Sequence, residues 1–393
     1  MIRPEKMKPS CKDGKSRATI SRRQFIRDLS TGAAGVALAS SFSGLALSEA
    51  KKAQDLSKVV IARHPNSVIG SLPSVTFDQS VVGELVNLAI ADLTGQEAPG
   101  LAWAQVFPGL TASNVIGIKV NCINSSCSSH PEVAHAIVEG LASMQVGSGN
   151  FPRNNIIVWD RLNAELSNAG YNHYTGSDPD AVRCFGTDES GYGYDSGSSI
   201  IVTGHTCNPS SILAQHSDYL INLAVLKNWQ GAAGVTLSLK NHLGSIHNPS
   251  AMHGMDPDIA ELSAEIRDSL DNKHRLAIID ALVGVRLGGP GSSPQFIYGG
   301  IIIGTDLVAV DYNGRQVLAD NGCATTGAAT YIETADDTYE LGTANPAEMD
   351  VVEHNPIAPA TREHVDKMIR FHKEGLATPL QVQWAINRYA RGM

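Results

Sequence analysis

The sequence predicts an α/β fold with a mostly parallel sheet flanked by helices and one long loop excursion. Two observations lead to this prediction. Short apolar runs alternate along the chain with segments of helical length, and this alternation is typical of βαβ units. The chain also has 393 residues, of which 42% are hydrophobic and 18% charged, so it is long enough to bury one large core or two ordinary ones.

Apolar runs of strand length predict the strands of this sheet. They lie at residues 59–62, where we expect an edge strand, and at 115–120, 156–159, 200–203, 219–223, 276–279 and 301–303. Longer segments predict helices at 81–93, 131–144, 256–270, 307–319, 361–374 and 378–391. Pro131 suits a first helical turn, and Asp256 suits a helix N-cap. Residues 166–199 are rich in Gly, Ser, Asp and Tyr and form the expected loop excursion.

The N-terminus has the order of a twin-arginine export signal. Ser21-Arg22-Arg23 opens the motif, a moderately apolar segment follows at 29–47, and small residues at 46–50 offer a cleavage site. We therefore expect a twin-arginine signal peptide at 1–50 and an α/β domain at 51–393. The alternative is a basic tail followed by a surface helix. The signal predicts a periplasmic or extracellular protein with the twin-arginine translocase as its partner during export. Because that route carries folded proteins, often with their cofactor, it favours a cofactor or metal.

The charge is spread unevenly along the chain. Residues 1–50 carry nine Lys/Arg and four Asp/Glu, which leaves 21 basic and 35 acidic residues, or −14, for the rest. A net charge of −14 on residues 51–393 argues against sequence-independent binding of nucleic acid, because such binding depends on neutralising phosphates.

Five cysteines follow the predicted signal, and none forms a CxxC motif. An internal iron–sulfur cluster of standard spacing is therefore not expected. Cys122 and Cys127 are close enough in sequence to pair after export, and inert buried thiols are the alternative.

Polar residues follow most of the predicted strands directly. They are Lys119 and Asn121, Asp160 and Arg161, Lys227, Asp280, and Thr305 with Asp306. In open α/β sheets, ligands bind beyond the carboxyl ends of the strands. These residues are therefore the first candidates for a site.

Six blocks of this sequence carry a family resemblance. They are Ile118-Lys119-Val120-Asn121, residues 157–160, 220–227 and 234–244, Ile279-Asp280-Ala281, and residues 304–311. In this order they resemble the DUF362 family of bacterial and archaeal proteins over roughly residues 110–320. Many relatives carry a ferredoxin-like segment, whose cysteines this chain lacks. Where the family often has Pro and His, this chain has Val120 and Asn228-Trp229. The resemblance implies a fold and a site, but no reaction.

The segment from Lys227 to His253 holds the densest set of chemical groups. Three lysines, Lys119, Lys227 and Lys240, lie in or beside apolar runs, where an ammonium needs a partner. One interpretation is a pocket for a carboxylate or phosphate, completed by Asn121, Asn241 and Asp160. The alternative pairs the lysines internally with Asp160, Asp280, Asp306 and Asp311. A desolvated lysine can also act as a base or a Schiff-base amine.

Three histidines in this segment allow two different roles. His242, His247 and His253 are possible ligands of a transition metal, held by a loop because their spacing does not align them on one helix. Otherwise His242 or His247 is the candidate general acid–base beside Lys240. Asp306 stands where a strand turns into a helix, so it is either a helix N-cap or a substrate ligand. Asp311 lies within that helix and could reach a ligand or a lysine.

Three function hypotheses follow. No GxGxxG, GxxxxGK[ST] or GxSxG motif is present, which disfavours a standard dinucleotide site and excludes a P-loop and a nucleophile elbow. The leading hypothesis is an exported enzyme acting on a small anionic substrate. The second is a periplasmic protein that binds a ligand or delivers a cofactor without turnover. The third is a redox accessory protein that docks on an iron–sulfur partner, as the cluster-bearing relatives suggest.

Overall fold

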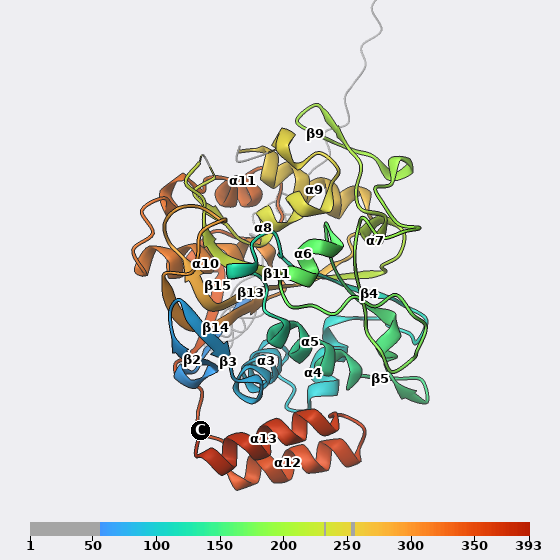
Figure 1. Cartoon of the computed structure of the whole chain (residues 1–393), viewed down its shortest axis with the longest axis vertical. Helices are drawn as coiled ribbons and strands as arrows, with labels where there is room; N and C mark the ends of the chain where they lie inside the picture. The colour runs from blue at the N-terminus through green and yellow to red at the C-terminus, as the bar shows by residue number, and fades with distance from the viewer. Residues whose placement is uncertain (1–55, 232, 253–255) are drawn as a thin grey trace, which may run out of the picture. The chain divides into compact units, whose positions relative to one another are not determined.

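A nine-stranded sheet forms the centre of the protein (Figure 1). The computed structural model describes residues 56–231, 233–252 and 256–393, so the predicted signal peptide at 1–50 and His253 lie outside the described residues. The strand order is β15-β1-β14-β13-β11-β4-β7-β8, and the short β12 pairs with β11. The strands are β1 (Ser57–Arg63), β4 (Ile116–Lys119), β7 (Ile156–Asp160), β8 (Arg183–Gly186), β11 (Tyr219–Asn228), β12 (Val235–Thr236), β13 (His274–Val285), β14 (Phe296–Gly304) and β15 (Met349–His354).

Most neighbouring strands of this sheet run parallel. The run from β13 through β11, β4 and β7 to β8 is parallel throughout, and so is the pair β1–β15. β14 runs antiparallel to both of its neighbours, and β12 is antiparallel to β11. The predicted α/β fold with a mostly parallel sheet is confirmed.

Helices cover both faces of the sheet (Figure 1). One face carries α3 (Gln79–Thr94), α4 (Pro99–Val106) and α5 (Pro131–Ala142), and the hairpin of α12 (Arg362–Lys373) and α13 (Pro379–Arg391) packs outside them. The other face carries α8 (Ser238–Asn241), α9 (Asp258–Ser269), α10 (Leu307–Asp320) and α11 (Tyr331–Asp337). The remaining elements are α6 (Asn163–Asn168), α7 (Ser211–Ala214) and three hairpins, β2 (Val68–Ser71) with β3 (Ser74–Phe77), β5 (Gln145–Val146) with β6 (Gly149–Asn150), and β9 (Ile200–Val202) with β10 (His205–Cys207).

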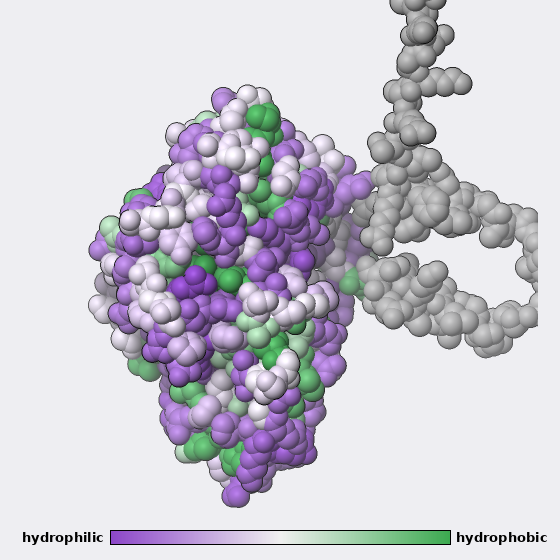
Figure 2. Space-filling view, turned by 90° about the vertical axis from the view of Figure 1, so that its right-hand side faces the viewer, coloured by the Kyte–Doolittle hydropathy of each residue, from purple (hydrophilic) through white to green (hydrophobic). Residues whose placement is uncertain are grey.

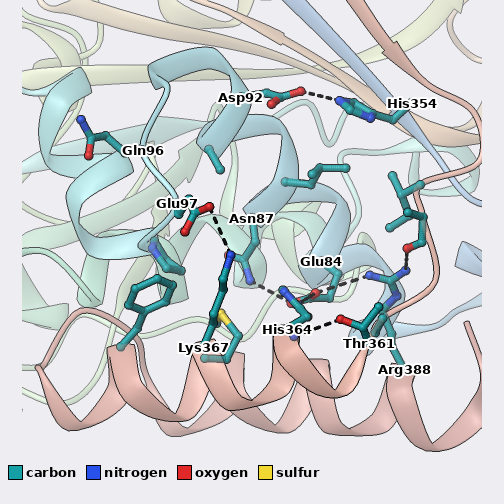
Figure 3. Close-up of a pocket in the computed structure, with 18 of the residues that line it drawn as sticks. Glu84, Asn87, Asp92, Gln96, Glu97, His354, Thr361, His364, Lys367 and Arg388 are labelled. Atoms are coloured by element: carbon teal, nitrogen blue, oxygen red, sulfur yellow. Dashed lines mark hydrogen bonds and ion pairs between the residues drawn. The ribbon is translucent and has the colours of Figure 1, made fainter.

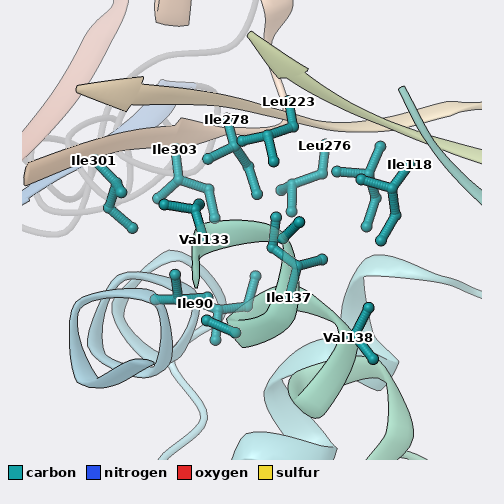
Figure 4. Close-up of a cluster of buried hydrophobic side chains, with 14 of the residues drawn as sticks. Ile90, Ile118, Val133, Ile137, Val138, Leu223, Leu276, Ile278, Ile301 and Ile303 are labelled. Carbon is teal, nitrogen blue, oxygen red and sulfur yellow. The ribbon is translucent and has the colours of Figure 1, made fainter. Parts of the chain in front are cut away.

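Three hydrophobic clusters hold the helices on the sheet, and the smallest of them joins α7 and α9 to β7, β8 and β11. Figure 4 shows part of the largest one, in which Leu223, Ile278 and Ile303 of the sheet meet Ile90 of α3 and Ile137 of α5. The next residue along each of those strands belongs to the cluster on the opposite face or borders it. Because both faces are covered, the strands are continuous apolar runs rather than alternating ones. This explains why short apolar runs identify them in the sequence.

Four expectations need correction. The strand expected at 200–203 is not part of the central sheet, because β9 pairs with β10 in a separate two-stranded hairpin. Residues 59–62 are not at an edge, because β1 lies between β14 and β15. The expected loop excursion at 166–199 contains β8, which forms one edge of the sheet. Asp256 is not the N-cap of α9, which starts at Asp258; the Asp256 carboxylate instead accepts a hydrogen bond from Thr334 Oγ1 at 2.9 Å.

Large exposed apolar residues are scattered over the described surface. Ile69, Leu101 and Ile201, for example, come from three different elements. Figure 2 shows one face, on which hydrophobic residues form small groups among hydrophilic ones. Among the described residues, no helix combines the length and apolar character needed to cross a bilayer.

Candidate functional site

A cavity of about 560 Å³ opens beyond the carboxyl ends of β4, β7 and β11. It is lined by five of the predicted site residues, Lys119, Asn121, Asp160, Lys240 and Asn241, together with Arg161, Trp229, Thr236 and Gly244 among others. Because β4 and β7 are parallel neighbours, the polar residues that end them meet at one edge of the sheet. The position of these residues directly after predicted strands was therefore sufficient to predict that they meet at one site.

Lys119 is neutralised within the protein. Its side chain is 1% exposed, and its Nζ donates to Asp160 Oδ1 and to the Val120 carbonyl, both at 2.7 Å. The second oxygen of Asp160 accepts from the backbone N–H of Cys122 at 2.6 Å. The internal salt bridge that we considered as an alternative is therefore present for Lys119. Gly244 packs on this pair, since a Cβ there would lie 2.9 Å from Lys119 Nζ.

A chain of side-chain amides connects the buried Lys227 to the cavity wall. Lys227 Nζ donates to Asn121 Oδ1 at 2.8 Å, and Asn121 Nδ2 donates to Asn241 Oδ1 at 3.1 Å. Asn241 Nδ2 then donates to Asn222 Oδ1 at 2.8 Å. Each hydrogen bond orients the next amide, so the whole chain has one polarity. Lys227 itself does not line the cavity, and its burial lowers its pKa.

Lys240 lines the cavity with an ammonium that has no acceptor among the described residues. Its side chain is 5% exposed, and its Nζ lies 4.4 Å from the centre of the Trp229 ring. Within the described residues, Lys240 forms no hydrogen bond or ion pair through this group, and no neighbouring charge contributes to the shift in its pKa. Burial lowers the pKa of Lys240 to about 8. The interaction with the Trp229 ring is a cation–π contact, which is weaker than a buried ion pair.

Asp311 holds the short helix that carries Lys240. The Asp311 carboxylate is fully buried and accepts from the backbone N–H groups of Ser238 at 2.7 Å and Leu239 at 2.9 Å. Burial raises the pKa of Asp311 to about 7. Asp306 caps α10 by accepting from Val308 N and Ala309 N, and burial raises its pKa too. Neither carboxylate lines the cavity, so both fix elements instead of contacting a ligand there.

The structure does not place His242 and His247 at the cavity. His242 is buried behind it: its Nε2 accepts from Asn222 Nδ2 at 3.2 Å, its Nδ1 lies 3.3 Å from Ser245 Oγ, and burial lowers its pKa well below the ordinary value. His247 is exposed, and its Nδ1 accepts from the Asn208 N–H at 2.8 Å. No group of three or more His, Cys, Asp or Glu side chains in the described parts of the chain is arranged to hold a metal ion.

The cysteines are separate buried thiols in the described structure. Cys122 and Cys127 are both free, as are Cys184, Cys207 and Cys323. Burial raises the pKa of Cys127 and of Cys184 to about 12. A thiol with so high a pKa is a poor nucleophile at neutral pH.

A second cavity, of about 540 Å³, lies between α3 and the α12–α13 hairpin (Figure 3). Its charged groups are paired with one another: Glu84 accepts from His364 Nε2 at 2.6 Å and from Arg388 Nη1 at 3.4 Å, and Lys367 lies 3.3 Å from Glu97. None of the residues that follow β4, β7 and β11 lines this cavity. The cavity at the strand ends is therefore the better candidate site.

The fold and the site together define an α/β protein with a lysine- and asparagine-lined cavity at the ends of parallel strands. The chain belongs to the DUF362 family, since the family described as "Domain of unknown function (DUF362)" matches residues 116–314. This match begins at β4 and ends in α10, so it includes the cavity, the amide chain and Asp311. The resemblance seen in the sequence is thereby confirmed.

The chain was also compared with curated protein sequences and with solved structures. A search of curated protein sequences finds no match to this chain. Among solved structures, the chain is similar to a protein from Thermotoga maritima whose crystal structure was determined as a target of the Northeast Structural Genomics Consortium. The two are 9% identical with a TM-score of 0.32, over 80% of this chain and 82% of the other. A similarity at this level carries no argument about function.

Some functional residues are not evident from the sequence. Asn222 ends the amide chain but lies inside an apolar strand, and a polar residue in a fully buried run is the one signal that could have revealed it. Trp229 directly follows β11, where aromatic residues are common for packing reasons alone.

Proposed function

We propose that this protein is an exported enzyme that binds a small anionic substrate, a carboxylate or phosphate, in the cavity at the ends of β4, β7 and β11. The observation that carries the proposal is Lys240, whose side chain is 5% exposed and whose ammonium has no acceptor among the described residues. Burying an unpaired charge costs free energy, and an anionic ligand would supply the missing partner. The buried Lys227 lies behind Asn121, to which its Nζ donates, and adds to the positive potential.

The residues of the cavity divide into two groups by their role in this proposal. Asn121 lines the cavity and has a second Nδ2 hydrogen besides the one donated to Asn241, so it can donate to a ligand oxygen. Lys240 balances the ligand charge and, with a pKa of about 8, exchanges protons near neutral pH. The Lys119–Asp160 pair and Asn241 keep this wall in place.

Calorimetry with defined anions tests the proposal. Inorganic phosphate, malonate and pyruvate are titrated into the protein at low salt, and Lys240→Met is compared with Lys367→Met, whose lysine is partly exposed on α12. We expect at least one anion to bind the wild type and the Lys367 variant but not the Lys240 variant. Unchanged binding by a folded Lys240→Met protein would overturn the proposal.

A second candidate function is binding without turnover. It is favoured by the positions of His242 and His247, because neither histidine lines the cavity to act as a general acid–base. Lys240→Arg separates the two functions. The variant keeps the positive charge. If the protein only binds its ligand, Lys240→Arg should therefore still bind that ligand and function normally. An enzyme that needs proton exchange at Lys240 retains binding and loses turnover.

Export is proposed on the N-terminal sequence alone. The Arg22-Arg23 pair, the apolar segment and the small residues occur in the order of a twin-arginine signal. We expect the full chain to reach the periplasm of a bacterial host with an intact twin-arginine translocase, and the double variant Arg22→Lys/Arg23→Lys to remain in the cytoplasm. Equal export of both proteins would refute this assignment.

A further inference from the structure

Lys240 differs from the other cations in and behind the cavity wall in having no acceptor among the described residues. Lys119 is bound to Asp160, and Arg161 is bound to Glu165. Lys227 donates to Asn121. An ammonium that is paired permanently with a carboxylate of the protein itself stays protonated and unreactive. Lys240 has no such carboxylate among the described residues, so its amino group can lose its proton before a substrate binds.

We propose that the amino group of Lys240 forms a covalent imine with the carbonyl carbon of a 2-oxo acid bound in the cavity. This inference rests on the proposed function, because it uses the same cavity and requires an anionic substrate. It adds the reacting group, the bond that forms and the chemical class of the substrate.

The bond changes balance without a further reagent. The lone pair of the neutral Lys240 nitrogen attacks the carbonyl carbon, and proton transfer from nitrogen to oxygen gives a carbinolamine. The proton that the Lys240 ammonium released to water when it became neutral is returned to this oxygen. The C–O bond then breaks, the oxygen leaves as water, and the nitrogen lone pair forms the C=N bond of a protonated imine. No atom is oxidised or reduced. The protonated imine then withdraws electrons from the neighbouring carbon, which is the usual reason for using lysine in this way.

The neutral amine is available near physiological pH in the protein without a bound ligand. A group with a pKa of about 8 is neutral in about a tenth of molecules at pH 7, whereas an ordinary lysine is neutral in fewer than about one in a thousand. Burial has a second effect, because exclusion of bulk water favours loss of water from the carbinolamine.

The surroundings of Lys240 are suited to orienting such a substrate. Asp311 fixes the first turn of α8 through two hydrogen bonds, so the lysine side chain starts from a rigid backbone. The Trp229 ring lies against the Nζ and leaves the rest of the cavity open to the substrate. The carboxylate of a 2-oxo acid can accept from the free Nδ2 hydrogen of Asn121 while its carbonyl carbon faces Lys240.

Borohydride trapping of the full protein tests the inference. The protein is incubated with pyruvate or glyoxylate, reduced with sodium borohydride, and analysed by intact mass and peptide mapping. We expect one reduced adduct on the peptide that contains Lys240, with a yield that rises between pH 6 and pH 8. Lys367→Arg should give the same adduct, and Lys240→Arg should give none. Mapping in the wild type keeps the test valid even where a variant fails to fold.

The outcomes separate this inference from the proposed function. Binding of pyruvate by calorimetry without an adduct at Lys240 refutes the imine and leaves the anion site intact. An adduct spread over surface lysines, or equal in Lys240→Arg, refutes the imine as well. If the protein binds none of the tested anions and also forms no adduct, both proposals are refuted.

Discussion

Replacing Lys240 with methionine should stabilise the protein while removing its ligand site. Lys240 is buried without an acceptor in the described structure, and its pKa is about 8 in the folded protein against 10.5 for an ordinary lysine. This difference corresponds to about 3 kcal/mol of unfavourable burial of the charged form. Loss of the contact with Trp229 offsets about 0.5–2 kcal/mol of the gain. At pH 7 we therefore expect Lys240→Met to raise the free energy of unfolding by about 1–3 kcal/mol.

The pH dependence has a definite sign. The unfolded lysine keeps its proton up to about pH 10.5, whereas the folded one loses it above about pH 8. Between these values the folded state binds fewer protons, so the stability of the wild type rises with pH. The advantage of Lys240→Met should therefore shrink from pH 8 to pH 10.5. Urea unfolding of both proteins at several pH values measures this difference.

Lys273 provides a matched control. It is also buried, but its Nζ donates to the carbonyls of Leu213 at 2.9 Å and Ala214 at 2.7 Å. Lys273→Met leaves these acceptors without their partner and should destabilise the protein by about 1–3 kcal/mol. Destabilisation by Lys240→Met of the same size as that by Lys273→Met would refute the reasoning, because it would mean that Lys240 has a partner.

Three further perturbations follow from the structure. Gly244→Ala places a methyl group 2.9 Å from Lys119 Nζ, so we expect a loss of about 1–3 kcal/mol in urea unfolding and weaker anion binding. Asp311→Asn removes a carboxyl whose pKa is raised to about 7, and wild-type stability from this group is lost as pH rises from about 4 through 7. The free energy of unfolding of Asp311→Asn, measured relative to that of the wild type, should therefore increase by about 4 kcal/mol between pH 4 and pH 7. Glu84→Ala leaves Arg388 buried without its carboxylate and should cost about 3–5 kcal/mol, with faster hydrogen exchange in α12 and α13.

Each of these expectations has an outcome that contradicts it. Normal anion binding by Gly244→Ala would show that the Lys119–Asp160 pair does not shape the cavity. A constant difference between wild type and Asp311→Asn from pH 4 to pH 8 would contradict the raised pKa. Unchanged hydrogen exchange in the hairpin of a Glu84→Ala protein would show that apolar contacts alone hold the hairpin.

The sequence located most of the sheet and much of the site for one physical reason. Buried parallel strands are apolar on both faces, so they appear as short uninterrupted runs, and polar residues such as Lys119 and Asp160 mark their ends. Strand ends in a parallel sheet share one edge, so these residues meet without any knowledge of the loops.

The remaining features depend on the folded chain. In β15 only Met349 is buried, the other residues are exposed or half-buried, and three are charged or titratable. The strand therefore lacks the apolar run that identified the central strands. The directions of His242 and His247 depend on the turns that follow α8, and sequence spacing does not give them. Asp311 holds residues that lie far earlier in the chain, and no local pattern shows such a contact.

The position of β1 has a consequence for synthesis of the protein. This strand emerges from the ribosome early, yet its two partners, β14 and β15, come near the end of the chain. Val59 and Val60 are fully buried in the folded sheet, but neither neighbouring strand of β1 exists while most of the chain is being synthesised. A strand of this kind is prone to aggregate, so the nascent chain should depend on a chaperone until translation is nearly complete.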